Sequence, residues 1–376
     1  MKMKTAYTLL MALALSATAA RADEDAAKLR ADLDALTERL AVLEESGVAA
    51  DTSSWTDKIT VKGDLRYRLE YVEKDDATSK NRQRIRARLG AYADVNDFTS
   101  AGIRIRTGQA ANSGNQSIGS DFNAKDIYLD LAYITLSPED AKYGAVTLGK
   151  MKFPWEVITD LIWDSDVNPE GVAYIYEGKA DNTAIFGSAG YFKVQESSST
   201  HDLNLGTGQL GVSQPIGEKT KATLGGSLYV YDNAKDFTDP STSTNYMVNY
   251  TIGELFAEVA VKEVLPVPFK FYGNYINNLE ESSDNTGFCV GIKFGDSKKG
   301  KWEAKVDYRD LDMNAAPAAY TDSDFAGGGT DVKGGRIKAA YNVGKNLQLA
   351  TALICGREKS SDTDVNTVQL DFIAKF

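Results

Sequence analysis

Histidine, cysteine and proline are scarce in this chain of 376 residues, which has one His, two Cys and eight Pro. The single histidine, His201, follows a Ser/Thr run, and no orienting partner for a Ser/His catalytic site is evident beside it. Cys289 and Cys355 fall on predicted strands that lie about 14 Å apart at about 4.8 Å per strand, beyond the reach of a disulfide. We therefore expect two free thiols, no cofactor, no metal site and no enzyme activity.

Long apolar runs are also missing. No uninterrupted run of about 18 apolar residues occurs outside the N-terminus, which excludes a helical membrane protein. The 32 Gly and 19 Tyr instead suit an all-β barrel, in which Gly relieves bends and Tyr lies at the bilayer interface. Residues 1–22 have the basic start, apolar centre and Ala-Arg-Ala end of a cleaved signal peptide. We expect a secreted protein that resides in the outer membrane of a Gram-negative-type envelope.

Arginine alternates with apolar residues in the segment 82–93, RQRIRARLGAYA. This period of two is typical of a strand, and the segments 58–72 and 99–110 keep it, so one face of three consecutive strands is basic. In a transmembrane barrel, lipid covers one face and water the other, and an arginine on the lipid side near the midplane costs roughly 2–4 kcal/mol. The arginines predicted to line the pore are Arg66, Arg68, Arg84, Arg86, Arg88, Arg104 and Arg106.

The same alternation continues to the last residue and predicts an all-β fold, a 16-stranded antiparallel transmembrane β-barrel over residues 58–376. Short and long connections alternate between the strands, as in outer-membrane barrels, and an even strand count places both barrel ends on the periplasmic side. One strand, 245–264, changes parity near Gly253, which predicts a β-bulge. The predicted strands are 58–72, 82–95, 99–110, 124–136, 145–152, 170–178, 183–194, 203–214, 219–232, 245–264, 267–279, 286–295, 301–311, 334–344, 346–358 and 364–376.

An apolar seam with a 3-4 spacing precedes the barrel and predicts a periplasmic coiled-coil helix over 23–46, followed by a linker at 47–57. We expect the seam to form a homotrimer; the alternatives are an amphipathic helix packed on its own barrel and a tether to the cell wall. The seam residues are Leu29, Leu33, Leu36, Leu40 and Leu43.

The final strand places Val368, Leu370, Phe372, Ala374 and Phe376 on one face. It resembles the C-terminal strand by which bacterial outer-membrane proteins are recognised for assembly. That resemblance implies the barrel-assembly machinery as a partner, with Leu370, Phe372 and Phe376 as the signal, and outer-membrane lipid around the barrel.

The connection 153–170, FPWEVITDLIWDSDVNPE, is too apolar for a solvated outer loop, yet it is also acidic. It resembles the third outer loop of trimeric porins, which folds into the lumen as a constriction. The runs LGKMKFPW and WDSDVNPEG resemble the putative-porin family of bacterial outer-membrane proteins, which implies a passive, trimeric channel. The carboxylates expected at the constriction are Glu156, Asp160, Asp164, Asp166 and Glu170.

An acidic loop opposite an arginine wall would create a transverse field that sorts ions and small solutes by size, dipole and charge. The alternative is that the arginines pair inside the wall with Asp64, Glu70, Asp94, Asp126 or Asp130. A Ca²⁺ site at Asp160, Asp164 and Asp166 is disfavoured because the spacing matches no EF-hand. The strand alternation around KNRQRIRARL argues against a nucleic-acid helix.

Three classes of function follow from this reading. A water-filled porin leads, a structural outer-membrane anchor with a closed barrel is the alternative, and an outer-membrane hydrolase at His201 is disfavoured. The ion preference stays open, since the arginines favour anions while the acidic loop and the net charge of -11 favour cations.

Overall fold

A computed structural model describes residues 57–376 and positions 31, 34, 35, 37 and 38, with residue 76 and the segments 139–143, 199–200, 241–243, 263–266 and 298–300 excepted. The chain divides into two compact units, Met1–Ile59 and Thr60–Phe376. The described positions between 31 and 38 are helical and exposed. The predicted signal peptide and the seam leucines of the predicted coiled coil lie outside the described residues. No helix in the described part is long and apolar enough to cross a membrane.

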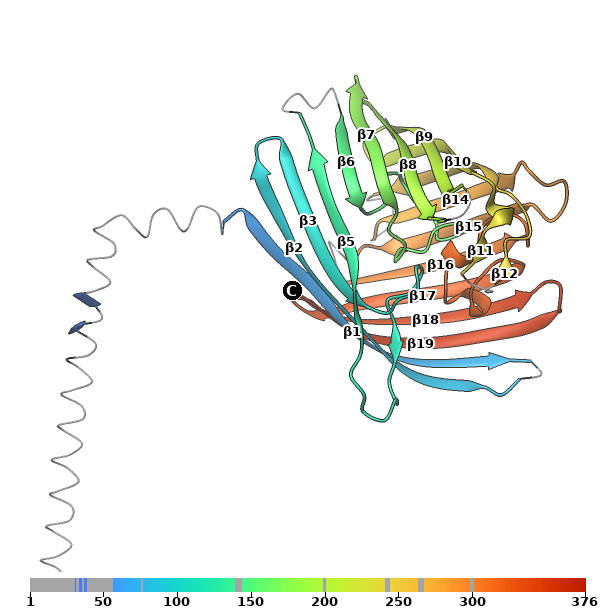
Figure 1. The fold of residues 1–376 in the computed structure, drawn as a ribbon, viewed down its shortest axis with the longest axis horizontal. Coiled ribbons are helices and arrows are strands. Elements are labelled where there is room, and N and C mark those ends of the chain that lie inside the picture. Colours follow the sequence, from blue (N-terminus) through green and yellow to red (C-terminus); the bar gives the residue numbers. More distant parts are fainter. Residues whose placement is uncertain are drawn as a thin grey trace, which may run out of the picture. The chain divides into compact units, whose positions relative to one another are not determined.

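Sixteen long strands form one antiparallel sheet that closes on itself, because β1 pairs with β19 over eleven residue pairs from Asp64↔Lys375 to Lys74↔Val365 (Figure 1). This confirms the predicted barrel. The long strands are β1 (Ile59–Lys74), β2 (Lys80–Asn96), β3 (Thr99–Thr107), β5 (Ile127–Leu136), β6 (Ala145–Lys150), β7 (Glu170–Ala180), β8 (Thr183–Gln195), β9 (Leu203–Ile216), β10 (Thr220–Tyr231), β13 (Thr251–Val261), β14 (Phe269–Asn278), β15 (Thr286–Gly295), β16 (Trp302–Leu311), β17 (Val332–Gly344), β18 (Leu347–Glu358) and β19 (Thr363–Lys375). The short elements are β4 (Gln116–Ser117), β11 (Thr238–Asp239), β12 (Thr244–Asn245) and the 3₁₀ helices η2 (Ala234–Asp236), η3 (Ala318–Tyr320) and η4 (Phe325–Gly327).

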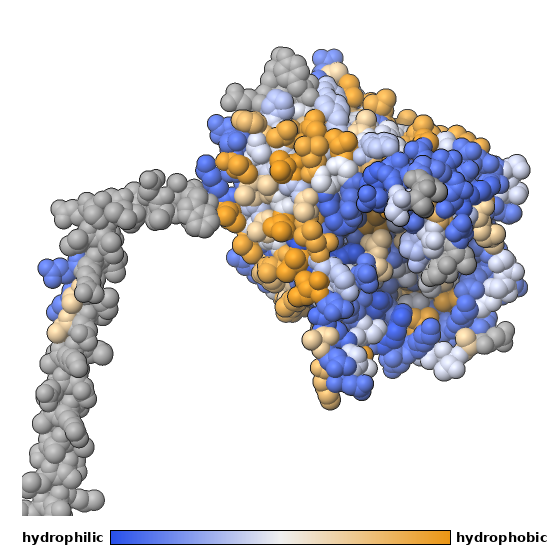
Figure 2. Space-filling view, viewed as in Figure 1, coloured by the Kyte–Doolittle hydropathy of each residue, from blue (hydrophilic) through white to orange (hydrophobic). Residues whose placement is uncertain are grey.

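The two faces of the wall differ as the alternation predicts. On β1, Arg68 and Glu70 are buried on the inner face, whereas Leu65 and Leu69 are exposed on the outer face. Figure 2 shows apolar residues gathered on the outside of the barrel where β1, β2 and β3 lie. Both cysteines are free: Cys289 is buried on β15 and Cys355 is exposed on β18, three strands away.

The strand predicted at 245–264 is present, but its predicted start at 245 and its predicted bulge near Gly253 are wrong. The strand observed there is β13, and its registers with β10 and β14 run through Gly253 without a shift. Tyr246, Val248 and Tyr250 are buried in an apolar core ahead of the strand. The parity change therefore reflects a change of surroundings, from apolar residues packed inward at the barrel mouth to apolar residues facing outward along the wall.

Both ends of the barrel wall meet at the end that carries the short connections, where Gly63 and Phe376 exchange two backbone hydrogen bonds of 2.9 and 3.0 Å. The opposite end is filled by an apolar core. Its residues come from the connection 151–169, from the strand ends beside the long connections, such as Tyr231 and Ile252, and from the connection 312–331. The long connections thus pack inside the barrel mouth, which places polar groups from two of them against the inner wall.

Candidate pore constriction

The connection between β6 and β7, residues 151–169, lies inside the barrel and is called the constriction loop here. Its contacts reach strands that are far apart around the wall. The Glu156 N–H donates to Gln209 Oε1 on β9 at 2.8 Å, Thr159 Oγ1 donates to Asn274 Oδ1 on β14 at 2.7 Å, and Asp166 accepts from Arg88 on β2 at 3.3 Å. The loop therefore crosses the lumen.

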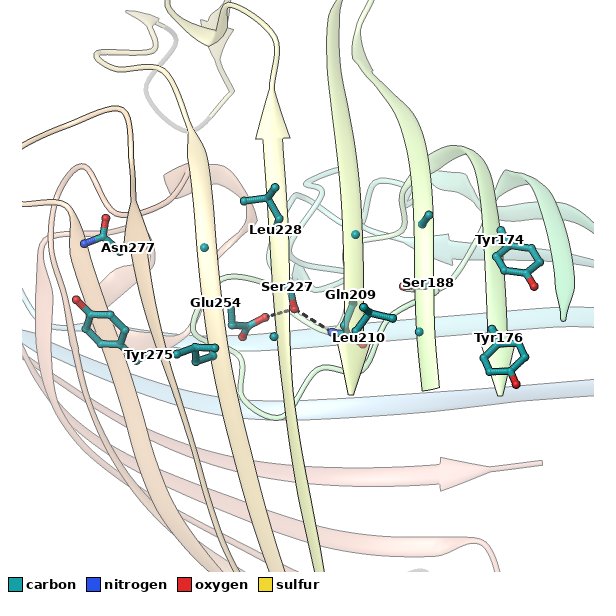
Figure 3. A pocket seen from close by; sticks show the side chains of 16 residues that line it. Tyr174, Tyr176, Ser188, Gln209, Leu210, Ser227, Leu228, Glu254, Tyr275 and Asn277 are labelled. Carbon is teal, nitrogen blue, oxygen red and sulfur yellow. Dashed lines mark hydrogen bonds between the residues drawn. The ribbon is translucent and has the colours of Figure 1, made fainter. Parts of the chain in front are cut away.

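Polar side chains of the wall support the loop where it meets β9. Figure 3 shows Gln209, Ser227 and Glu254 joined by hydrogen bonds across β9, β10 and β13. Gln209 Nε2 donates to Ser227 Oγ at 3.0 Å and to the Glu156 carbonyl oxygen at 3.0 Å, and Ser227 Oγ donates to Glu254 Oε2 at 2.8 Å. Because each group is buried and satisfied, this chain of hydrogen bonds fixes the height of the loop in the barrel.

An aromatic cluster holds the loop against the β8–β10 side of the wall. The Trp155 ring packs against Trp163, Phe192 and Tyr229 at centroid distances of 5.4, 5.7 and 5.6 Å. Trp163 also stacks on Tyr320 of the connection 312–331 at 6.0 Å. Aromatic pairs at these distances contribute about 0.5–1.5 kcal/mol each beyond their buried area, so the loop is packed rather than solvated.

All seven predicted pore arginines have carboxylate partners. The ion pairs are Arg66 with Asp371 (3.7 Å), Arg68 with Asp371 (2.7 Å) and Asp324 (2.7 Å), Arg84 with Glu70 (3.5 Å), Arg86 with Asp64 (2.9 Å) and Asp166 (3.6 Å), Arg88 with Asp64 (2.7 Å) and Asp166 (3.3 Å), Arg104 with Asp130 (2.5 Å) and Arg106 with Asp130 (3.2 Å). Asp64, Glu70 and Asp130 of these partners lie within the wall, whereas Asp166 belongs to the constriction loop and contacts the arginines directly. Within the described residues, Asp94 and Asp126 form no ion pair with these arginines.

The predicted loop carboxylates go to different places. Asp166 touches the arginine wall, where burial opposes ionisation but Arg86, the Gly114 N–H and Arg88 outweigh it and hold the pKa of Asp166 below its usual range. Glu156 is exposed, and Glu170 is the first residue of β7, where it pairs with Lys150 at 2.5 Å. Among the described residues, no group of three carboxylate, His or Cys side chains is placed to hold a metal ion.

Asp164 lies where the constriction loop meets the connection 312–331, called the second inward loop here. The Asp164 N–H donates to the Tyr320 carbonyl oxygen at 2.8 Å, and the Ser323 N–H donates to Asp164 Oδ2 at 3.2 Å. Burial and the neighbouring Asp322 and Asp166 carboxylates raise the pKa of Asp164 to about 8. The two inward loops thus share a carboxyl group that holds its proton at neutral pH.

A second basic centre, on β16 and β17, was not predicted. Arg309 and Arg336 are almost fully buried, and both contact Asp160 at the tip of the constriction loop and Asp322 of the second inward loop. Arg336 also pairs with Asp307 at 3.0 Å. Asp160 was predicted to face the seven arginines, but it binds this centre instead. The alternation of Lys305, Asp307 and Arg309 with apolar residues is the sequence signal that marks it.

Two hollows lie on opposite sides of the β7–β14 wall. The inner one, a cavity of about 620 Å³, lies beneath the constriction loop and is lined by Glu156, Lys221, Glu258 and Lys270 among others. The outer one, of about 910 Å³, is floored by glycines and flanked by Tyr174 and Tyr275 (Figure 3). The outer hollow faces away from the lumen, whereas the inner cavity belongs to the candidate passage.

A closed barrel of sixteen strands is wide enough to hold an aqueous channel, and an inward loop that narrows it makes this a porin-type architecture. The chain belongs to the family described as Putative porin, whose family model matches residues 72–283 and 257–376. Family and fold both indicate a channel rather than an enzyme. No curated protein matches the chain in sequence.

Solved structures of bacterial porins share the fold. Pseudomonas putida OprB matches with a TM-score of 0.58 and 11% identity, covering 88% of this chain and 97% of its own. OmpF of Salmonella typhi, in complex with daunomycin, matches with a TM-score of 0.53 and 12% identity, covering 86% and 99%. A loop L8 deletion mutant of OmpT, an outer membrane protein of Vibrio cholerae, matches with a TM-score of 0.50 and 13% identity, covering 85% and 100%. At these identities the likeness shows the fold alone.

Proposed function

We propose that this protein is an outer-membrane porin that allows passive diffusion of ions and small hydrophilic solutes. The observation that carries the proposal is the constriction loop, which is held inside a closed sixteen-stranded barrel by Asp166 on the arginine wall and by Asp160 on β16 and β17. Membership in the Putative porin family supports it. A loop anchored at both sides narrows the lumen without being part of the wall, so it sets the size limit for solutes.

The charge balance of the arginine wall favours anions. With Arg82, which also pairs with Glu70, eight arginines share six carboxylates, so the wall keeps a surplus of two positive charges; the six are Asp64, Glu70, Asp130, Asp166, Asp324 and Asp371. Because Asp166 is in direct contact with Arg88, their charges partly cancel instead of facing each other across an opening. The passage therefore runs beside this contact, through water that borders a wall of net positive charge.

The envelope organisation belongs to the same proposal. A cleaved signal peptide at 1–22 would export the chain, and the barrel-assembly machinery would recognise the final strand, where Leu370, Phe372 and Phe376 are exposed on the outer face toward lipid. The helix at 23–46 would form a homotrimer in the periplasm through its leucine seam. The short connections and both wall ends would then lie on the periplasmic side.

One observation favours a second function. The apolar core fills the barrel mouth, and the constriction loop touches walls on several sides of the lumen. A barrel closed in this way would serve as a structural anchor of the envelope rather than as a channel.

Conductance of the purified, folded protein in planar bilayers decides between the two. We expect steps in groups of three, and a reversal potential in a salt gradient that favours anions and moves toward zero in Arg84→Ala/Arg86→Ala. Arg357→Ala is the matched control, because Arg357 is an exposed arginine paired at 2.6 Å with Asp364. The absence of any conductance from protein shown to be folded would exclude the channel and favour the structural anchor.

A further inference from the structure

We propose that a row of four inward lysines on β14 to β17 forms a track that binds small oxyanions, phosphate or carboxylate, and leads them to the constriction; this rests on the proposed channel function. The register pairs Lys270 with Lys293, Lys293 with Lys305, and Lys305 with Lys338. Each strand from β14 to β17 therefore contributes one lysine directly opposite the next.

All four lysines lie on the lumen side of the wall. Their neighbours along each strand, such as Phe271, Val306 and Ile337, are exposed on the outer face, and alternation places the lysines opposite them. Like charges directly opposite each other on neighbouring strands are destabilising. A fold that accepts three such contacts in succession keeps a continuous row of ammonium groups in the lumen, which an anion path can use.

The row climbs from one barrel end to the constriction. Lys270 is the second residue of β14 and Lys293 lies two residues before the end of β15, both at the end with the short connections. Lys305 is the fourth residue of β16, and Lys338 lies six residues before the end of β17. Lys338 reaches Asp160, the tip of the constriction loop, at 3.8 Å.

The surplus positive charge lies in the half of the row nearer the constriction, at Lys305 and Lys338. Lys270 and Lys293 each have a carboxylate of their own, Glu258 at 2.9 Å and Glu303 at 3.0 Å. Lys305 and Lys338 instead make longer contacts, of 3.4 and 3.8 Å, to Asp307 and Asp160, which already bind Arg336.

Four cations thus share three carboxylates beside the loop tip: Arg309, Arg336, Lys305 and Lys338 face Asp160, Asp307 and Asp322. The ammonium groups of Lys305 and Lys338 each have three N–H donors and direct at most one of them at these carboxylates. Both lysines can therefore donate to an oxyanion. The geometry assigns the binding step to Lys305 and Lys338 and the entry step to Lys270 and Lys293.

Inorganic phosphate is the probe. In planar bilayers with a chloride electrolyte, phosphate should reduce the wild-type current, and Lys305→Gln/Lys338→Gln should need an about tenfold higher phosphate concentration for half the effect, the loss expected for about one charged hydrogen bond. Lys179→Gln is the matched control, because Lys179 also lines the lumen cavity but lies on β7, outside the row. Equal sensitivity of all three proteins to phosphate would overturn the lysine track.

Calorimetric titration of phosphate into the folded protein in detergent keeps the test independent of conduction. Binding that Lys305→Gln/Lys338→Gln weakens about tenfold and Lys179→Gln preserves supports the track even in a closed barrel, whereas a folded wild type that binds no phosphate refutes it. The single variants Lys305→Gln and Lys338→Gln replace the double variant if it does not fold.

Discussion

Arg68 shows what a single inward charge does for this fold. Its side chain is only 4% exposed and binds both oxygens of Asp371, at 2.7 and 2.9 Å, and Asp324 at 2.7 Å. Removal of one partner from a buried ion pair costs about 3–5 kcal/mol, because the remaining charge stays buried without compensation. We expect Arg68→Ala to lower the free energy of unfolding by about this amount, measured by urea unfolding in detergent micelles.

The control for Arg68 is an exposed arginine on the same barrel. Arg357 binds Asp364 and Asp362, but its side chain is 41% exposed. Exposed ion pairs contribute little because water and salt screen the charges, so Arg357→Ala should change the unfolding free energy little. Equal losses in the two variants would mean that burial does not determine the strength of these pairs.

For single residues, the sequence predicts whether a strand side chain faces the lumen or the outside, but not which carboxylate it pairs with. The alternation along β1, β2 and β3 identified seven inward arginines of these strands, but the predicted set left out Arg82 of β2, which also pairs with Glu70. It did not identify Asp371 as a partner of Arg68, because the two residues are 303 positions apart and meet only when the barrel closes. The Arg309 and Arg336 centre escaped prediction for the same reason, since two of its three carboxylates, Asp160 and Asp322, come from loops whose path no sequence period encodes.

The two inward loops depend on one carboxyl group, and this makes their contact sensitive to pH. Burial, Asp322 and Asp166 raise the pKa of Asp164 to about 8, above its ordinary value of 3.8. The folded protein therefore holds a proton that the unfolded chain releases. The stability gained is fully present below the ordinary pKa and is lost as the pH rises to about 8, by about 1.4 kcal/mol per pH unit at most.

We expect the melting temperature of the wild type to fall between pH 5 and pH 8 and Asp164→Asn to flatten this dependence, because the amide keeps the neutral form. Asp121→Asn is the matched control, since Asp121 is an exposed carboxylate of the connection between β4 and β5. An unchanged pH dependence in Asp164→Asn would show that the loop contact does not depend on this proton.

At the scale of the elements, strands were predictable and inward segments were not. Fifteen of the sixteen predicted strands match an observed strand to within a few residues, because lipid on one side and polar lumen on the other impose a period of two. The segment 246–250 does not follow this period-two rule, because it packs inside the barrel mouth, where its apolar side chains contact other protein side chains. The apolar and acidic composition of 153–170 predicted a loop that is not solvated, but its contacts with β9, β14, β16 and β17 depend on the closed barrel.

At the scale of the whole molecule, the outer face of the wall must face lipid if the barrel spans a membrane. Leu224 and Thr223 are neighbours on β10; Leu224 is 60% exposed on the outer face, whereas Thr223 lines the lumen cavity. An arginine on the lipid face near the bilayer midplane costs roughly 2–4 kcal/mol, and one facing a wet lumen avoids that cost. We therefore expect Leu224→Arg to lower the stability of the barrel in lipid vesicles by about this amount and Thr223→Arg to lower it much less. Urea titrations of the protein refolded into vesicles measure both.

The difference should shrink when the same proteins are unfolded from a detergent with a small polar head group, because a micelle deforms to let the arginine reach water. Equal losses in vesicles would mean that the outer face of β10 is not in contact with lipid.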